Sequence, residues 1–334
     1  MKVLGINKEA FNLHEENNNL ANFDDGHFSE RGAIIVLPKL MEVLASPKAL
    51  IEGFQKTRDY LHSNGITVIG NPGSMYNKGL QTAKNLIFGN VDSPFESYFF
   101  PSALNISEQF KLNEVLDAAK EQTSWGTGKL NYLPKHIKLF ADGAMYSQNM
   151  VMRDGYIDGH EGSWLMSLDT FENLFKIFWD DGYQIHIHQN GDAGLDRLLA
   201  TLKKNLEMNP RTDHRTTVVH FGYSAKDQLQ QMKKLGVVVS ANPYYVTALS
   251  DLYSRKGVGY ERSQEMVRLG DAIKSGIKVA LHSDMPMAPA SPLMLMHAAV
   301  NRDNFAGKVA GPNQRITKVE ALRAVTINSA YVLR

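Results

Sequence analysis

The stretch Gln184-Ile-His-Ile-His-Gln-Asn-Gly-Asp192 decides the fold class of this 334-residue chain. Its first five residues alternate isoleucine with histidine. Because strand side chains alternate between two faces, the isoleucines are expected on one face and the histidines on the other. Gly191 supplies the flexible backbone of a turn, and Asp192 is predicted to be the N-cap of a helix over residues 193–207. A strand that leads directly into a helix is the repeating unit of parallel α/β sheets.

The same alternation of strand-like runs with amphipathic helical stretches extends along most of the chain. Strand-like runs are predicted at residues 65–70, 97–101, 136–141, 184–188, 217–220, 237–242 and 279–284, seven in all. Helices are predicted at residues 47–63, 107–122, 168–181, 193–207, 225–235 and 262–275. Capping-box patterns at Ser224–Asp227 and Thr317–Glu320 are predicted to open helices. The alternation indicates βαβ units in a single α/β domain over residues 1–334.

Four residues of metal-ligand type, Lys138, His188, His220 and Asp284, lie near the ends of four different strand-like runs. Alternation along each run is expected to place them on the face opposite the one taken as apolar. In the run 217–220, Thr217 and Val219 form that apolar face, so His220 shares its own face with Val218. If the sheet closes into a parallel barrel, that face becomes the interior, and the four side chains converge at the carboxyl ends of the strands. The pattern predicts a metal site at that end.

Each of these residues also has a purely structural explanation. A single buried histidine such as His220 is more often hydrogen-bonded than metal-bound, and Asp284 precedes Met285-Pro286 and could cap a turn. An inward-facing ammonium is costly to bury, so Lys138 needs either a carboxylate partner or a neutral amine. A neutral amine can react with carbon dioxide, and the resulting carbamate is an anionic oxygen ligand that can bridge two metal ions.

Composition excludes several classes of function. The formal net charge is +1 and no run of basic residues stands out, which argues against a nucleic-acid partner or an anionic membrane surface. The chain has no cysteine, so a disulfide scaffold, a thiolate nucleophile and a Cys-ligated zinc are excluded, and a reducing, cytoplasmic location is expected. No apolar stretch is long enough for a membrane span. Dinucleotide, serine-hydrolase and metalloprotease motifs are absent.

Several motifs occur in the order typical of one known family. They are Lys138-Leu-Phe-Ala-Asp-Gly143, His188-Gln-Asn-Gly-Asp192, Val219-His220, Ser283-Asp-Met-Pro286 and Glu320-Ala-Leu-Arg-Ala-Val-Thr-Ile-Asn-Ser-Ala330. From about Gly65 to its end the chain resembles the amidohydrolase superfamily, and within it the branch of N-substituted formamide deformylases and exoenzyme-regulator-like proteins. The resemblance implies a (β/α)8 barrel and metal-dependent hydrolysis of N-acyl or N-formyl C–N bonds in a small-molecule amide.

The resemblance also implies a role for each candidate. Lys138 corresponds to a carboxylated lysine that bridges two divalent ions, zinc being the expected metal. His188 and His220 correspond to the metal ligands of the fifth and sixth strands. Asp284 corresponds to the acid of the eighth strand, a metal ligand that accepts the proton of the attacking water and delivers it to the leaving nitrogen.

Weaker candidates are expected around the barrel mouth. His186 and His282 are candidates for substrate contact or for stabilising the transition state. His160 lies in the segment 158–164, which is expected to be a loop above the mouth, where barrel enzymes build their pockets. Tyr244, in the pair Tyr244-Tyr245, either packs at the mouth or contacts substrate.

The chain departs from the family pattern at its start. The family's first strand ends in a His-x-His pair, but the histidines before residue 186 are His14, His27, His62 and His136, and none forms such a pair. The barrel is therefore expected to be incomplete, with an irregular lead-in over residues 1–46, strands two to eight over residues 65–334, and no β-sandwich. At most about one tightly held ion is expected, since three protein ligands suffice for zinc. Unpaired edges also predict a homo-oligomer. The alternative is a non-catalytic or truncated barrel remnant with a binding, regulatory or assembly role.

Overall fold

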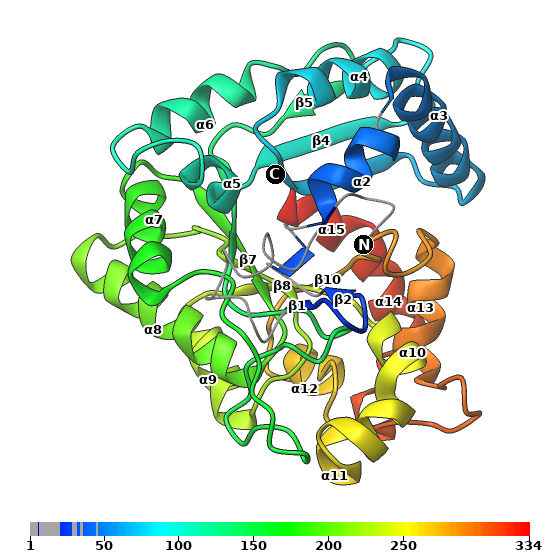
Figure 1. Cartoon of the computed structure of the whole chain (residues 1–334). Helices are drawn as coiled ribbons and strands as arrows, with labels where there is room; N and C mark the ends of the chain where they lie inside the picture. Colours follow the sequence, from blue (N-terminus) through cyan, green and yellow to red (C-terminus); the bar gives the residue numbers. More distant parts are fainter. Residues whose placement is uncertain (1–5, 7–20, 29–31, 34–35, 45) are drawn as a thin grey trace.

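Two parallel sheets surrounded by helices form the centre of the protein (Figure 1). The computed structural model describes residues 6, 21–28, 32–33, 36–44 and 46–334. The larger sheet has the strand order β10-β9-β8-β7-β6, and the smaller has the order β3-β4-β5. The strands are β3 Val68–Ser74, β4 Glu96–Pro101, β5 Leu130–Tyr132, β6 His136–Phe140, β7 Gln184–Gln189, β8 Thr217–His220, β9 Val238–Ala241 and β10 Val279–Leu281. The predicted α/β class with parallel strands is confirmed, and β5 is a strand that the sequence pattern did not predict.

The two sheets are joined side by side. A parallel bridge between Ser102, which follows β4, and Lys138 in β6 connects them. The strand order therefore runs continuously from β3 to β10. Within the described residues, β3 and β10 each pair with one neighbour only, so each presents an open edge.

Alternation along β6 and β7 follows the prediction. Ile137, Leu139, Ile185 and Ile187 are fully buried in the main hydrophobic core. They pack there with side chains of the flanking helices, such as Trp179. Burial of an aliphatic side chain of this size contributes roughly 1.5–3 kcal/mol. The polar residues of the same strands, including Lys138 and His188, are thereby directed to the opposite, inner face.

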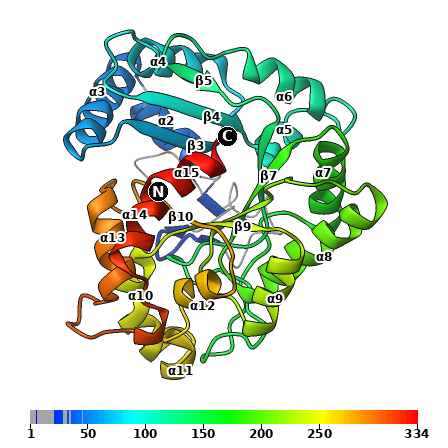
Figure 2. The same ribbon diagram turned by 180° about the vertical axis from the view of Figure 1, so that it is seen from behind.

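The helices from residue 47 onward flank the strands on the outside, with the exception of α15 at the C-terminus (Figures 1 and 2). They are α3 Pro47–Ser63, α4 Lys78–Phe88, α5 Ala103–Ser107, α6 Val115–Thr123, α7 Leu168–Asp180, α8 Asp192–Met208, α9 Lys226–Lys234, α10 Tyr244–Leu252, α11 Tyr260–Ser263, α12 Leu269–Lys274, α13 Pro292–Asn301, α14 Lys318–Val325 and α15 Ile327–Val332, with a π-turn at Tyr253–Gly257 and a 3-10 turn at Pro312–Gln314. The predictions for α3, α7, α8 and α9 agree with the structure to within two residues. None of the helices described is both long and apolar enough to cross a membrane.

Two predicted helices are wrong over part of their length. In the stretch 107–122, α5 ends at Ser107 and α6 begins only after Glu114, whose side chain makes no capping hydrogen bond. The stretch 262–275 is interrupted at Val267, whose φ of 47° is left-handed. The missed helices α4, α10 and α13 begin after Asn77, Pro243 and Ser291, and Asn77 and Ser291 are side-chain caps.

The helix starts show which capping predictions hold. Thr317 and Glu320 form the predicted capping box. The prediction at Ser224 is wrong by one residue, because Ala225 is the N-cap and its N–H donates to the Gln228 side chain. Asp192 is not the N-cap of α8 either. Gly191 occupies that position with an ordinary φ of −89°.

The C-terminal helix α15 connects the open edges of β3 and β10 from inside. Its residue Val332 packs with Val238 of β9 and Ala280 of β10, and Gln184 Nε2 donates to Val332 O at 2.9 Å. Leu333 lies so close to Gly70 of β3 that a Cβ there would meet its side chain at 2.7 Å. In both ribbon views α15 accordingly lies between the smaller sheet and β10 (Figures 1 and 2).

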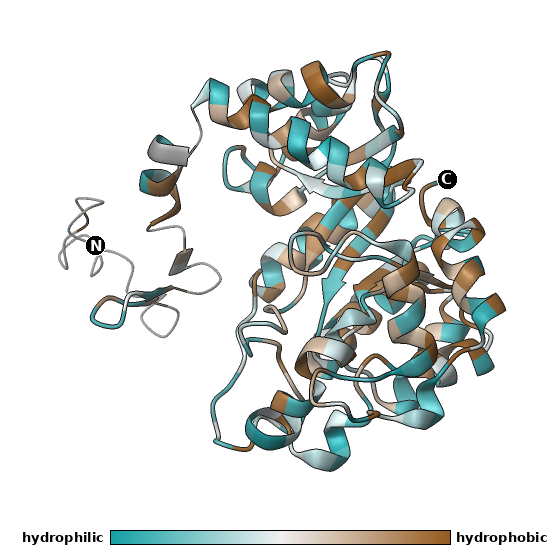
Figure 3. Ribbon diagram, turned by 90° about the vertical axis from the view of Figure 1, so that its right-hand side faces the viewer, coloured by the Kyte–Doolittle hydropathy of each residue, from teal (hydrophilic) through white to brown (hydrophobic). Residues whose placement is uncertain are grey.

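The predicted irregular lead-in contains regular elements where it is described. β1 (Ala21–Asn22) and β2 (His27–Phe28) form an antiparallel pair, and α2 spans Leu37–Leu44. Figure 3 shows these elements to one side of the parallel sheets. His27 is exposed, and His14 lies outside the described residues.

Candidate metal and catalytic site

Lys138 faces the interior from the middle of β6 and is only 3% exposed. Its Nζ lies 5.4 Å from the centroid of the Phe140 ring. Gly73 of β3 allows this packing, because a Cβ there would already touch Lys138 Cγ at 3.4 Å. Among the described residues, no carboxylate lies within ion-pair distance of Nζ. Burial lowers the pKa of Lys138 to about 7, although the charge of Asp284 opposes the shift. At pH 7 about half of the amine is therefore in its neutral, reactive form.

His188 and His220 meet at the ends of adjacent strands. Their ring centroids are 4.5 Å apart in an edge-to-face arrangement. His188 Nε2 lies 3.0 Å from Asn190 Nδ2 and 3.5 Å from Gly143 O. His220 Nδ1 lies 2.9 Å from His282 Nε2. These contacts leave Nδ1 of His188 and Nε2 of His220 available to a ligand.

His220 reaches this position by a different route from the predicted one. Val218 packs in the main outer core, and Thr217 Oγ1 accepts a 3.4 Å hydrogen bond from Gln184 Nε2 on the inner side. The expectation that His220 shares the face of Val218 is therefore wrong. Instead, the backbone turns left-handed at the strand end, with φ of 79° at His220 and 54° at Phe221. The alternation rule fails here because it holds only for extended backbone.

Asp284 approaches the same pair from the loop after β10. Its own φ is 56°, and Oδ2 lies 3.7 Å from His220 Nδ1. Partial desolvation raises the pKa of Asp284, whose side chain is 42% exposed, whereas the charge of Lys138 lowers it. The carboxylate thus lies beside the imidazoles in an environment that favours holding a proton.

The donor set suits one metal ion better than two. Across the described part of the chain, no three His, Cys, Asp or Glu side chains converge to hold an ion by themselves. Two neutral imidazoles do converge, and Lys138 faces the same interior. Burial lowers the pKa of His188 to about 3 and that of His220 well below its usual value, so both are free of competing protons. Neutral imidazole is the form that binds metals.

The weaker candidates separate into two groups. His282 belongs to the site, because it contacts His220 directly. His186 lies deeper, where its Nε2 is 3.1 Å from His136 Nδ1 and its ring packs at a tilt on Phe100. His186 and His136 therefore have structural partners away from the candidate ligands.

The remaining weak candidates lie outside the donor set. His160 is held by Asp158 Oδ1 at 2.6 Å and Gln148 O at 2.9 Å, so both of its ring nitrogens are engaged. Tyr244 packs edge-to-face on Phe305. Its neighbour Tyr245 is the residue near the site, with its ring centroid 6.4 Å from that of His220.

Tyr146 is a site residue that the sequence pattern did not reveal. Its Oη is buried and has no hydrogen-bond partner among the described residues. The ring packs edge-to-face on Tyr245 at 5.4 Å. Burial, followed by the proximity of Tyr244 and Asp284, raises the pKa of Tyr146. Tyr146 lies three residues after the Asp-Gly pair that follows β6, and no hydrophobic period in the sequence marks this position.

Asp142 holds together the turn that carries His188. Its carboxylate accepts hydrogen bonds from the N–H groups of Asn190, Gly191 and Val151 at 2.7–3.0 Å. The side chain is fully buried, and burial raises its pKa to about 7 against the effect of these donors. A Cβ on Gly194 would meet this carboxylate at 2.6 Å, so α8 also packs directly against it.

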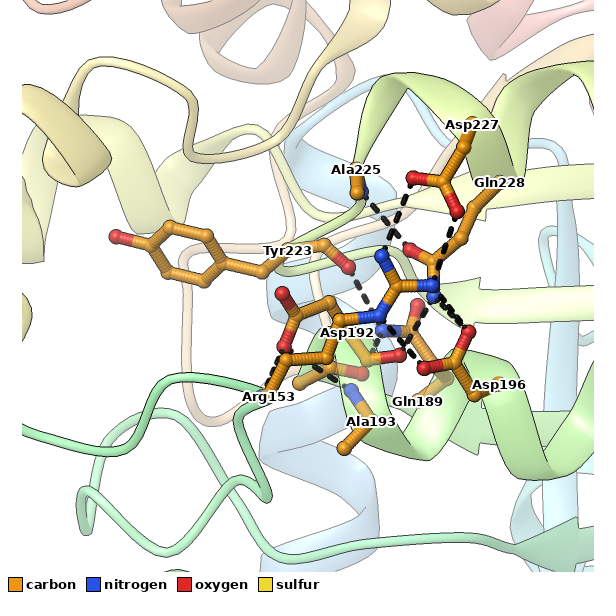
Figure 4. Close-up of polar contacts among 10 residues, drawn as sticks. Arg153, Gln189, Asp192, Ala193, Asp196, Tyr223, Ala225, Asp227 and Gln228 are labelled. Atoms are coloured by element: carbon orange, nitrogen blue, oxygen red, sulfur yellow. Dashed lines mark hydrogen bonds and ion pairs between the residues drawn. The ribbon is translucent and has the colours of Figure 1, made fainter.

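A second polar cluster anchors the loop that contains Tyr146 (Figure 4). The Arg153 guanidinium binds Asp196 of α8 at 2.5–2.6 Å and Asp227 of α9 at 3.1 Å. Its backbone N–H donates to Asp192 Oδ1 at 2.8 Å. The loop between β6 and α7 is thereby fixed to α8 and α9, the helices that follow the strands of His188 and His220.

A sequence profile of the amidohydrolase family matches residues 27–334. This chain belongs to the amidohydrolase family. Among curated proteins, this amidohydrolase is 28% identical over 198 residues to the protein LONG AFTER FAR-RED 3 of Arabidopsis thaliana, covering 58% of the chain and 34% of the relative. It is 25% identical over 195 residues to N-substituted formamide deformylase of Arthrobacter pascens, covering 58% and 36%. The aligned part is thus about a third of each relative.

A solved structure shares the fold of this amidohydrolase. The crystal structure of an uncharacterized metal-dependent hydrolase from Pyrococcus horikoshii superposes with a TM-score of 0.74 at 21% identity. The match covers 94% of this chain and 62% of that one. At this identity the likeness concerns the fold, and the family assignment rests on the sequence profile.

Proposed function

We propose that this chain provides the catalytic centre of a metal-dependent hydrolase that cleaves N-acyl or N-formyl C–N bonds of small amides. The observation that supports the proposal is the proximity of His188, His220 and Asp284 at or after the ends of three strands, with Lys138 facing the same interior from the middle of β6. Amide chemistry is the activity named for the relative from Arthrobacter pascens, and this supports the substrate class. An incomplete (β/α)8 barrel built from the seven predicted strands, with β5 as an additional strand beside β4, belongs to the same proposal, as do a cytoplasmic location and a homo-oligomeric state.

One divalent ion would be held by His188 and His220, with Lys138 as the third ligand. Zinc suits two imidazoles and one anionic oxygen. When bound, such an ion supplies Lewis-acid polarisation of the amide carbonyl and acidifies a water molecule. The chain supplies neutral imidazoles for this purpose at neutral pH, because burial has already lowered the pKa of each.

Lys138 becomes a suitable ligand by reaction with carbon dioxide. Its neutral Nζ forms a bond to the carbon of carbon dioxide and loses one proton to solvent, which leaves a carbamate anion. The step requires the unprotonated amine, and the lowered pKa of Lys138 makes that form abundant at neutral pH. The carbamate also replaces a costly buried cation by an anion next to neutral imidazoles.

Asp284 and Tyr146 supply the proton transfers and the orientation of substrate. Asp284 takes a proton from the attacking water and gives it to the leaving nitrogen, a role that the raised pKa of its carboxyl favours. The buried hydroxyl of Tyr146, which has no partner among the described residues, would donate to the substrate carbonyl oxygen.

The test is a hydrolysis assay on chain reconstituted with zinc and bicarbonate. N-formyl and N-acetyl derivatives of benzylamine and of simple alkylamines are offered, and amine release is measured. We expect turnover that is abolished in Asp284→Asn and in Lys138→Met but retained in His160→Gln, which lies outside the donor set. Equal amine release from Asp284→Asn would overturn the assigned role of Asp284.

A non-catalytic role in binding or assembly is the second candidate function. It is favoured by the absence, within the described residues, of three His, Cys, Asp or Glu side chains that could hold an ion unaided. In that case zinc-loaded chain would release no amine from any derivative.

A further inference from the structure

A chain of hydrogen bonds connects β9, the end of β10 and the end of β8. Ser240 Oγ lies 2.9 Å from His282 Nδ1, and His282 Nε2 lies 2.9 Å from His220 Nδ1. The rings of His282 and His220 meet edge-to-face with centroids 4.9 Å apart. The ring of His220 is therefore oriented by His282, which is in turn oriented by Ser240.

The geometry gives this chain of hydrogen bonds a direction if Nε2 of His220 is to bind a metal ion. A neutral imidazole carries one proton, so a lone pair on His220 Nε2 requires the proton on Nδ1. That Nδ1–H then donates to His282 Nε2 at 2.9 Å, and His282 Nδ1–H donates to Ser240 Oγ, a hydroxyl that can accept.

The alternative acceptor for His220 is too far away. Asp284 Oδ2 lies 3.7 Å from the same Nδ1, beyond hydrogen-bonding distance. His282 is thus the acceptor within reach of the His220 Nδ1–H group, and this group does not engage the Asp284 carboxylate.

We infer that His282, oriented by Ser240, is a positioning residue that fixes the tautomer of His220 so that its Nε2 can accept a metal ion. This role differs from the substrate contact that the sequence suggested for His282. It rests on the proposed function only in the identity of the ligand that Nε2 receives. Replacing a residue that hydrogen-bonds to a metal-binding histidine commonly changes the metal affinity by about 10–100-fold.

The tautomer can be measured without any metal. Nitrogen-15 NMR of metal-free chain labelled at histidine reports which ring nitrogen carries the proton. We expect His220 protonated at Nδ1 in the wild type and no longer fixed in that form in His282→Phe. In His282→Gln the side-chain carbonyl can still accept, so the Nδ1–H form is expected to persist. His220 protonated at Nε2 in the wild type would overturn the inference.

Zinc affinity provides the second readout, by competition with a chromophoric chelator. We expect about 10–100-fold weaker binding in His282→Phe, a smaller loss in His282→Gln and Ser240→Ala, and none in His214→Phe, where a buried histidine far from the site is removed. Unchanged affinity in His282→Phe would contradict the role. If the wild type binds no zinc, the proposed function fails, and the NMR result alone decides the inference.

Discussion

The amine of Lys138 is the least compensated charge among the described site residues. It is nearly fully buried and lies over the Phe140 ring, and among the described residues the only carboxylate that influences its pKa is Asp284. Burying such a group destabilises the folded chain, and the same burial lowers its pKa and makes it reactive.

Replacing this lysine by an isosteric apolar residue should stabilise metal-free, carbonate-free protein. In Lys138→Met we expect the free energy of unfolding at pH 7 to rise by about 2–4 kcal/mol. The folded pKa of about 7 lies below the unfolded value of 10.5, so the folded state binds fewer protons between these values. The free energy of unfolding of the wild type should therefore rise relative to that of the variant as the pH rises from 7 to 10.5. Urea denaturation at several pH values measures the difference, and a constant gap would contradict the assignment.

Tyr146 should contribute to catalysis without contributing to stability. Since its hydroxyl has no partner among the described residues, Tyr146→Phe is expected to leave the midpoint of urea unfolding unchanged or slightly raised. Loss of a donor to the substrate oxygen should lower kcat by about 10²-fold or more, with zinc affinity unaltered. Tyr244→Phe is the matched control. A destabilised Tyr146→Phe with normal kcat would show the hydroxyl to be structural.

At the scale of elements, strand alternation placed Lys138 and His188 on the correct face but not His220. The first two lie within extended strands, where the period of two holds. His220 and Asp284 follow the strands with left-handed φ angles of 79° and 56°, which no residue type at those positions signals. Their arrival at the site was predictable only from the motifs that resemble the family. Asp142 belongs to the motif that begins at Lys138, whereas no pattern in the sequence marked Tyr146.

The turn after β7 depends on a close approach at Gly191. A Cβ there would meet Val151 O at 2.0 Å, so the glycine is required for space and not for a positive φ. We expect Gly191→Ala to destabilise the chain by more than about 2 kcal/mol, because neither backbone can move without breaking the bonds to Asp142. In Gly53→Ala, on the open face of α3, nothing lies within 4 Å of the new Cβ, and a gain of about 0.5–1 kcal/mol is expected. Thermal unfolding compares the two, and equal effects would refute the packing argument.

At the scale of the whole molecule, β3, β5 and β10 each have an unpaired edge within the described residues, and α15 reaches from β10 to β3. The sequence predicted the parallel strands and most flanking helices, because their hydrophobic periods are local. It did not predict the place of α15, which depends on contacts with Gln184 and Gly70, far away in the sequence.

Open edges favour association with another chain. We expect light scattering coupled to size-exclusion chromatography to give a mass above that of one 334-residue chain at micromolar concentration. A lysine placed on the β3 edge, Val68→Lys, should shift the equilibrium toward monomer, since Val68 is half exposed there. The exposed helical substitution Leu86→Lys is the control. A monomer at all concentrations would refute the prediction.

The central claim is that Lys138, His188 and His220 hold a single divalent ion. Elemental analysis after reconstitution with zinc and bicarbonate, followed by removal of loosely bound metal, measures it directly. About one zinc per chain is predicted for the wild type, and almost none for Lys138→Met and for His220→Phe. Two ions per wild-type chain, none at all, or a full ion retained by Lys138→Met would contradict the account.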